Sequence, residues 1–326
     1  MLKITQDTAF GEIKNADEFS DISKFLMVQS PGEAERTDRF TFAQACGSKA
    51  GFITDAMCWL QDEIGEFGTI SYDIWDKQEK AADPSKKLTN LFFFPGRPYG
   101  PYVIVCAGGA YVSVCNVLEA FPAAKELTGL GYNVFALTYR VAQSPLLPKP
   151  QEDLAQAVRF IEANADAFRV RPGDYAVCGF SAGGHLAASF GTGSIGYKAY
   201  GVPRPGALFL GYAASTVRVF DLSLPVAQGY VTTMIGSDWS EERLDYASVD
   251  RNMDGDYPPV YAIHCMDDDT VPYKSLQVLG ERLGELGIPN RLETVHNCGH
   301  GFATGFGESE GWLKRAAAFW EEIRHE

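Results

Sequence analysis

The most reactive pattern in this chain is a serine placed between small residues. Residues 179–183 read Gly-Phe-Ser-Ala-Gly, after an apolar run at 175–178 and before a helix-like run at 184–190. A sharp strand-to-helix turn strains its central residue, so small residues on both sides are needed for the chain to pass itself. Gly179 and Gly183 meet that need. The pattern predicts a Ser181 hydroxyl held out at a helix N-terminus, where it would act as a nucleophile.

A serine hydroxyl needs a base to remove its proton, and the chain offers five histidines. His300 stands in the glycine-flanked loop 297–302, Asn-Cys-Gly-His-Gly-Phe, just after a strand-like run. An imidazole there could swing over the edge of a sheet, so we predict His300 as the base, with His296 as the alternative. The other three lie on the helix after the serine (His185), within a strand-like run (His264) and next to the C-terminus (His325).

The base in turn needs an orienting carboxylate and the reaction needs donors for an oxyanion. Residues 267–269 are three consecutive aspartates that follow a strand-like run, and the chemistry alone does not choose among them. At least one is expected to form a solvated turn that caps the next helix. For the oxyanion, residues 105–111 read Val-Cys-Ala-Gly-Gly-Ala-Tyr after the third strand-like run. Backbone N–H groups of this loop and of the residue after the serine would bind the developing charge.

The elements that must position these residues alternate between strand and helix from about residue 68 onward. This alternation predicts an α/β fold, an eight-stranded and mostly parallel sheet with helices on both faces. The first two strands have no helix between them and are expected to pair antiparallel. The strand candidates are residues 69–75, 89–94, 102–106, 132–138, 175–179, 207–212, 260–265 and 291–296. The helix candidates are residues 117–130, 152–167, 182–192, 272–286 and 311–324.

Residues 1–67 do not fit the alternation, and 68–326 form the expected catalytic domain. The first segment carries many large apolar residues, among them Phe19, Phe42 and Met57, which is too many for a disordered tail. We expect it to pack on the sheet as structural padding, or else to serve as a lid or as a contact in a homo-oligomer. In the second part, Arg140 follows a strand and is expected to pair with Asp153.

Composition excludes several classes of function. The net charge of −14 argues against nucleic acid as a partner, because phosphate contacts require clustered basic residues. No apolar run is long enough to span a membrane, and the first residues lack the pattern of a secretory signal, so a cytoplasmic location is expected. The seven cysteines contain no Cys-x-x-Cys pair, and we predict free thiols, no metal and no cofactor.

Taken together, these motifs resemble the α/β-hydrolase esterases. Within them, the chain is most similar to the acetyl-esterase and carbohydrate-esterase-like group, which includes xylan esterases and lipase/esterase relatives. The resemblance covers roughly residues 68–325. It rests on five stretches: the Gly-Phe-Ser-Ala-Gly-Gly-His run, the 107–111 loop, Tyr139-Arg140-Val141, the aspartate loop and the Gly-His-Gly-Phe ending. Ala107 and Ala110 replace a proline and a glycine of the family's oxyanion loop, and Cys265 replaces a glycine.

The resemblance implies specific roles. It places the acid at Asp268, three residues before Val271, and takes oxyanion donors from Gly109, Ala110 and Ala182. An alanine at position 110 keeps its N–H, which serves if its φ is negative or if the strain is tolerated. Three aromatic residues that follow or adjoin strand ends are expected to line a substrate pocket, although each is more often a packing residue (Tyr111, Tyr212 and Phe302).

The sequence therefore predicts a serine carboxylesterase with the triad Ser181, Asp268 and His300. Its expected substrate is a small-molecule ester with a small acyl group, acetyl in the first place, on a carbohydrate or another polar alcohol. A peptidase or amidase of the same fold is the alternative, although such peptidases usually carry a larger accessory domain than about 67 residues allow. A non-catalytic binding protein on the same scaffold is the alternative outside the enzymes.

Overall fold

The computed structural model describes residues 1–325 and contains one eight-stranded sheet. The strand order is β1-β2-β4-β3-β5-β6-β7-β8, and all pairs from β4 to β8 are parallel. The strands are β1 Ser71–Tyr72, β2 Asn90–Phe94, β3 Gly100–Cys106, β4 Asn133–Thr138, β5 Val170–Phe180, β6 Ala207–Gly211, β7 Val260–Cys265 and β8 Asn290–Val295. The predicted α/β class is confirmed, as is the antiparallel pairing of the first two strands.

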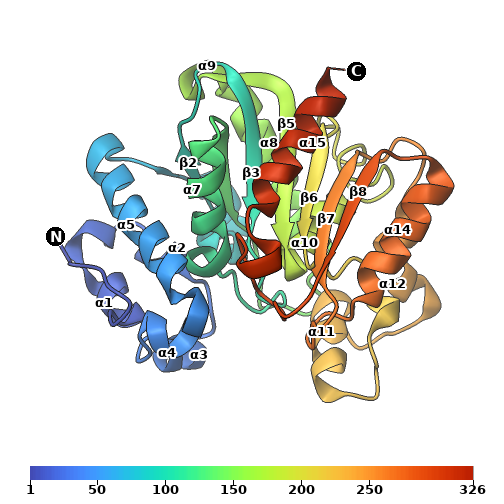
Figure 1. Ribbon diagram of the computed structural model, residues 1–326, viewed down its shortest axis with the longest axis horizontal. Coiled ribbons are helices and arrows are strands. Elements are labelled where there is room, and N and C mark those ends of the chain that lie inside the picture. The colour runs from blue at the N-terminus through green and yellow to red at the C-terminus, as the bar shows by residue number, and fades with distance from the viewer. Residues whose placement is uncertain (326) are drawn as a thin grey trace.

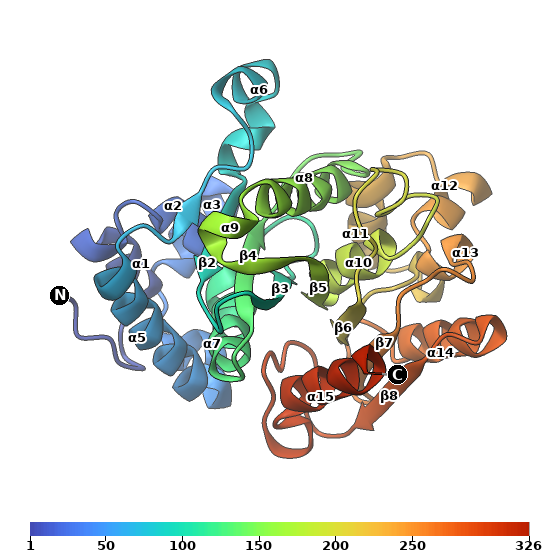
Figure 2. The same ribbon diagram turned by 90° about the horizontal axis from the view of Figure 1, so that it is seen from above.

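Helices cover both faces of the sheet. After residue 67 they are α6 Lys77–Ala82, α7 Phe121–Gly129, α8 Lys149–Ala163, α9 Ala165–Phe168, α10 Ser181–Phe190, α11 Pro225–Ile235, α12 Glu241–Tyr246, α13 Val249–Asn252, α14 Lys274–Leu286 and α15 Trp312–Arg324. Figure 2 shows α8 on one side of the sheet, with α7 and α15 on the other. Contacts of α8 with α10 and of α7 with α15 complete these two layers.

Most strands follow buried apolar runs, and the exceptions are β1, the start of β5 and β8. β3 and β4 are buried along their whole length, as expected for strands covered on both faces. The predicted strand 69–75 is wrong in extent, because only two residues pair with β2. After these two residues the chain leaves the sheet edge. The Trp75 indole N–H donates to the Asp153 carboxylate at 2.9 Å.

A buried ion pair joins the end of β4 to α8. The Arg140 Nε donates to both carboxylate oxygens of Asp153 at 3.0 Å, and both side chains are fully enclosed. The guanidinium also pairs with Asp83 and Glu152 at 3.0 and 2.7 Å, and it donates to the Lys149 carbonyl oxygen at 3.0 Å. The predicted pairing of Arg140 with Asp153 is confirmed. Because each charge is compensated, the pair fixes how the helix lies on the sheet.

The first 67 residues form a helical layer beside α7, drawn in blue in Figure 1. Its helices are α1 Phe10–Asn15, α2 Ser23–Leu26, α3 Pro31–Thr37, α4 Phe42–Cys46 and α5 Ala50–Phe67. Their buried side chains belong to the same hydrophobic core as the sheet. Val28 exchanges two backbone hydrogen bonds with Val114, at 3.1 and 2.9 Å. The segment is thereby tied to the loop that follows β3.

Candidate active site

Ser181 lies at the junction of β5 and α10, where the chain turns most sharply. Its φ is +51°, a conformation that residues with a side chain rarely adopt. A Cβ on Gly179 would lie 2.2 Å from the Gly183 carbonyl oxygen, and one on Gly183 would lie 2.2 Å from that of Cys106. Only glycine fits at either position. The spatial reason inferred for these two glycines from the sequence is confirmed.

The structure brings Ser181, His300 and Asp268 together at the carboxyl edge of the sheet. The His300 Nε2 lies 2.9 Å from the Ser181 Oγ, and its Nδ1 lies 2.7 Å from the Asp268 Oδ2. Asp268 follows β7 and His300 follows β8, so three different strand ends supply the three residues. This order of contacts allows the imidazole to take the serine proton while the carboxylate fixes the imidazole tautomer.

The carboxylate of Asp268 is buried and fully hydrogen-bonded. The N–H groups of Thr270 and Val271 donate to its Oδ1 at 2.9 and 2.8 Å. Its Oδ2 also lies 3.2 Å from the Nε2 of His264, to which the sequence assigned no role. Burial raises the pKa of Asp268, but hydrogen bonds from His264 and His300 outweigh it and hold the pKa well below its usual range. Asp268 is therefore ionised at neutral pH.

The alternatives weighed from the sequence have other partners. Asp267 accepts a hydrogen bond from the Asn297 N–H at 2.9 Å, and Asp269 accepts one from the Thr270 hydroxyl at 3.1 Å. His296 is exposed, and its Nδ1 faces the Glu308 carboxylate at 3.3 Å. His185 is enclosed, with its Nδ1 at 2.7 Å from the Tyr111 hydroxyl. Burial lowers the pKa of His185 to about 4, so it stays neutral.

The loop after β3 lies beside Ser181, and its Gly109 and Ala110 line a cavity together with the serine. Gly109 and Ala110 have φ of +135° and +52°, so Ala110 carries strain on the order of 1–3 kcal/mol. Hydrogen bonds from the N–H groups of Val112 and Ser113 to the Gly109 carbonyl hold this conformation. Within residues 1–325, the N–H groups of Gly109 and Ala110 donate to no acceptor. As the second residue of α10, Ala182 also has an N–H without a partner in its helix.

A buried glutamate, missed from the sequence, links this loop to the histidine loop. Glu119, in the π-type turn Asn116–Ala120 before α7, accepts hydrogen bonds from the Gly108 N–H and, at 2.8 Å, from the Tyr212 hydroxyl. The Tyr212 oxygen in turn accepts one from the Ala303 N–H at 3.0 Å. Burial raises the pKa of Glu119. The one feature of the sequence that could have indicated a buried Glu119 is its position as an acid inside the apolar run 117–121.

The three aromatic residues expected to line the pocket do not do so. Tyr111, Tyr212 and Phe302 are all enclosed and lie outside the linings of the cavities at Ser181. The hydroxyl of Tyr111 is hydrogen-bonded to His185, and the hydroxyl of Tyr212 donates to Glu119. The Phe302 ring packs on the Tyr212 ring, with the ring centres 4.6 Å apart. The expectation was wrong because each side chain turns into the core.

Two cavities meet at Ser181. The first, about 460 Å³, lies between the N-terminal segment and the histidine loop and is lined by Ala45, Cys46, Lys49, Ile53, Gly109, Ala110, Val112, Ser113, Cys115, Leu118, Glu119, Ser181, Thr270, His300 and Gly301. The second, about 510 Å³, is mainly apolar and is lined by the 219–233 region, which includes Phe220, Leu224 and Tyr230, and by the loop 269–272. Ala110, Val112, Ser181 and Thr270 line both cavities.

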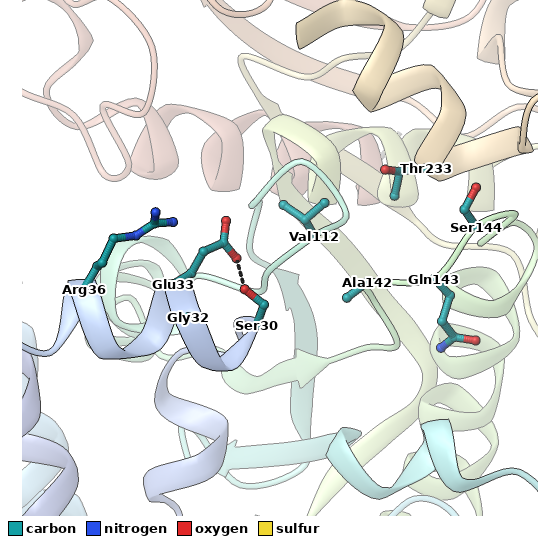
Figure 3. A pocket seen from close by; sticks show the side chains of 9 residues that line it. All are labelled: Ser30, Gly32, Glu33, Arg36, Val112, Ala142, Gln143, Ser144 and Thr233. Carbon is teal, nitrogen blue, oxygen red and sulfur yellow. Dashed lines mark hydrogen bonds between the residues drawn. The ribbon is translucent and has the colours of Figure 1, made fainter. Parts of the chain in front are cut away.

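A third cavity, about 620 Å³, lies over α3 and contains neither Ser181 nor His300 (Figure 3). Its polar lining residues include Ser30, Glu33 and Arg36 on one side and Gln143 and Ser144 on the other. It shares Val112 with both cavities at the serine and Thr233 with the apolar one. The three cavities therefore adjoin one another around Val112.

Two structural features are absent from residues 1–325. No helix in this range combines the length and apolarity of a membrane span. Nor does the range contain a cluster of three or more His, Cys, Asp or Glu side chains that could hold a metal ion.

The sheet order and the Ser-His-Asp contacts at its carboxyl edge define the class of the α/β hydrolases. The model of the prolyl oligopeptidase family matches residues 147–325, more than half of the chain, and a second model, BD-FAE, matches residues 96–196. The chain belongs to the prolyl oligopeptidase family.

Curated relatives include esterases and a xylanase. The chain is 28% identical over 196 residues to endo-1,4-beta-xylanase B of Butyrivibrio fibrisolvens. The aligned residues cover 57% of this chain and 30% of that protein. It is 31% identical over 106 residues to an acetylxylan esterase of Xylanibacter ruminicola, covering 32% of this chain and 22% of that protein. The chain thus spans less than a third of the length of these relatives.

Solved structures share the fold. The acetyl ester-xyloside bifunctional hydrolase from Caldicellulosiruptor lactoaceticus superposes with a TM-score of 0.66 at 23% identity, covering 78% of this chain and 96% of that one. A truncated carbohydrate esterase from gut microbiota superposes with a TM-score of 0.61 at 20% identity, covering 79% and 97%.

Proposed function

We propose that this protein is a carboxylic ester hydrolase with Ser181 as nucleophile, His300 as general base and acid, and Asp268 as the orienting carboxylate. The observation that carries the proposal is the continuous chain of contacts from the Ser181 Oγ to the His300 Nε2 at 2.9 Å and from the His300 Nδ1 to Asp268 at 2.7 Å. The free N–H groups of Gly109, Ala110 and Ala182 are the proposed oxyanion donors.

In this mechanism the Ser181 Oγ forms a bond to the ester carbonyl carbon while its proton passes to the His300 Nε2. The carbonyl oxygen becomes an oxyanion held by the N–H groups. The C–O bond to the alcohol then breaks, and His300 gives its proton to the leaving oxygen. Water attacks the acyl-enzyme with His300 as base, which releases the carboxylic acid and returns the proton to Ser181.

The proposed substrates are esters of short acyl groups, acetyl included, on a carbohydrate or a similar polar alcohol. Support comes from relatives named as an acetylxylan esterase and a carbohydrate esterase. The apolar cavity of about 510 Å³ beside Ser181 also leaves room for acyl groups larger than acetyl. A series of 4-nitrophenyl esters from acetate to hexanoate measures the preferred acyl length, since each buried methylene contributes about 0.8 kcal/mol.

The experiment that tests the function is hydrolysis of 4-nitrophenyl acetate by the parent and by Ser181→Ala. We expect the variant to keep less than about one per cent of the parent activity, because the oxyanion donors alone provide little turnover. Ser194→Ala, which removes an exposed serine hydroxyl, is the control and should behave as the parent. An active Ser181→Ala would contradict the proposal.

A peptidase is the second candidate, because the family model that covers most of the chain is that of the prolyl oligopeptidases. The same serine chemistry cleaves amides when the leaving amine is protonated. Aminoacyl 4-nitroanilides assayed beside 4-nitrophenyl acetate distinguish the two candidates. Higher kcat/KM on an anilide than on the ester would favour the peptidase.

A further inference from the structure

Lys49 brings a cation from the N-terminal segment to the edge of the catalytic cavity. It is half-buried and ends the short turn Gly47–Lys49 before α5, and its Nζ donates to the His300 carbonyl oxygen at 2.9 Å. An ammonium group has three N–H donors, and within residues 1–325 the Lys49 Nζ makes this one hydrogen bond. Lys49 lines the same cavity as Ser181 and His300, so donors remain for a ligand there.

The acids nearest to Lys49 are already engaged. Glu119 accepts from Gly108 and Tyr212, and Asp268 accepts from His300 and backbone N–H groups. No carboxylate oxygen of residues 1–325 lies within 4.0 Å of the Lys49 Nζ. The ionised Asp268 would still repel a carboxylate placed in the cavity. A neutral ligand with acceptor oxygens, such as a hydroxyl-rich alcohol, suits the ammonium better than an acid.

The direction of proton transfer shows which part of an ester would meet Lys49. His300 must hand its proton to the leaving oxygen, so the alcohol lies on the His300 side of Ser181. Of the two cavities at the serine, the one that contains Lys49 is lined by His300 and Gly301, whereas the apolar one is not. The alcohol then occupies the first cavity and the acyl group the second.

We infer that the cavity between the N-terminal segment and the histidine loop binds the alcohol part of the ester, and that Lys49 is its polar anchor. The ligand class is a polyhydroxy alcohol, a sugar residue whose hydroxyls next to the ester accept hydrogen bonds from Lys49. This inference rests on the proposed ester hydrolase function. It makes Lys49 a specificity-determining residue supplied by the N-terminal segment.

The test compares two esters that share the acetyl group. For the parent, Lys49→Met and Lys125→Met, kcat/KM is measured on a methyl xyloside carrying one acetyl group and on 4-nitrophenyl acetate. The quotient is the first kcat/KM divided by the second. Both esters give the same acetyl-enzyme, so the quotient reports the alcohol alone. In Lys49→Met this quotient should fall by about tenfold or more, because a hydrogen bond from a charged donor to the sugar is lost. Lys125, which pairs with Asp55 outside this cavity, is the control and should leave it unchanged.

Each outcome decides the inference. Equal losses on both esters in Lys49→Met would mean that Lys49 acts only through the His300 loop, and the inference would be overturned. If circular dichroism shows Lys49→Met to be misfolded, Lys49→Gln takes its place with the same expected fall in the quotient. Failure of the proposed function is a separate result, in which the folded parent hydrolyses neither ester.

Discussion

At the scale of single residues, Asp268 differs from Asp267 and Asp269 by its surroundings rather than by its chemistry. It is enclosed and receives hydrogen bonds from two backbone N–H groups and from His300, with His264 at 3.2 Å. Its neighbours face other partners at the surface. The choice among three identical side chains is thus made by the backbone of the loop after β7.

Replacing each of the three aspartates by asparagine tests this distinction. Asp268→Asn should lower kcat on 4-nitrophenyl acetate about a thousandfold or more, because an amide at this position favours the wrong imidazole tautomer. Asp267→Asn and Asp269→Asn should each change kcat less than about threefold, and steady-state kinetics measures all three. A comparable loss in either neighbour would mean that the acid has been misassigned.

Tyr212 contributes through its hydroxyl rather than as a pocket wall. It connects Glu119, which holds the oxyanion loop, to the N–H of Ala303 in the histidine loop. Both partners are buried, so removal of the hydroxyl leaves the Glu119 Oε1 and the Ala303 N–H without a hydrogen-bond partner, at a cost of about 1–3 kcal/mol. We interpret Tyr212 and Glu119 as positioning residues.

Tyr212→Phe should therefore lower kcat about tenfold and leave KM within about twofold, because positioning of the catalytic groups is lost while the cavities stay intact. Tyr132→Phe is a matched control, since Tyr132 donates to Glu321 in another tyrosine–glutamate pair, between the start of β4 and α15. A purely structural role would appear as equal stability losses in both variants with kcat unchanged.

At the scale of elements, the carboxyl ends of β3, β5, β7 and β8 supply the oxyanion loop, the serine, the aspartate and the histidine. Residues far apart in the chain meet there because parallel strands share one edge. The junction of β5 and α10 is the tightest point, since α10 passes directly over the end of β3. Gly179 and Gly183 are therefore needed for α10 to pack against the end of β3.

Gly183→Ala tests that close approach. The new methyl group would lie 2.2 Å from the Cys106 carbonyl oxygen and 2.4 Å from that of Ala107. We expect the free energy of unfolding to fall by about 4 kcal/mol or more, measured by chemical denaturation. Gly65→Ala, on the exposed side of α5 with open space around it, should instead stabilise by about 0.5–1 kcal/mol. A Gly183→Ala variant as stable as the parent would refute the packing argument.

Most strands were predictable because buried parallel strands are short apolar runs bounded by polar residues. Strands β2 to β7 contain such runs, whereas β8 is mostly exposed or half-buried. β1 is shorter than its apolar pattern because Trp75 turns toward Asp153. The site could be predicted where the local backbone allows only one residue type, as the tight turn does at Gly179 and Gly183. Side-chain direction had no such signal, and Tyr111, Tyr212 and Phe302 were therefore misplaced.

At the scale of the whole molecule, the N-terminal segment lines one of the two cavities at Ser181. It shares the hydrophobic core, bonds to the loop after β3 through Val28, and carries Lys49 to His300. Lys49 and His300 are 251 residues apart, and their contact depends on how α5 packs against α7. No pattern in the sequence encodes that packing. A contact between subunits through this segment stays a prediction.

If the segment is an integral layer, truncating one of its core residues should destabilise the whole protein. Phe19 is fully buried, and Phe19→Ala should lower the free energy of unfolding by about 3–5 kcal/mol. Phe40 in the same segment is 49% exposed, and Phe40→Ala should cost less than about 1 kcal/mol. Denaturation followed by circular dichroism measures both. Equal and small effects would indicate a loosely docked segment.

The central claim is that Ser181 is a nucleophile activated by His300, and covalent labelling tests it most directly. A fluorophosphonate probe should add one equivalent to the folded protein, measured by intact mass, with peptide mapping placing it on Ser181. Ser181→Ala should take up none, and His300→Gln should react at least about a hundredfold more slowly because the base is lost. An unlabelled parent, or a label that persists in Ser181→Ala, would contradict the claim.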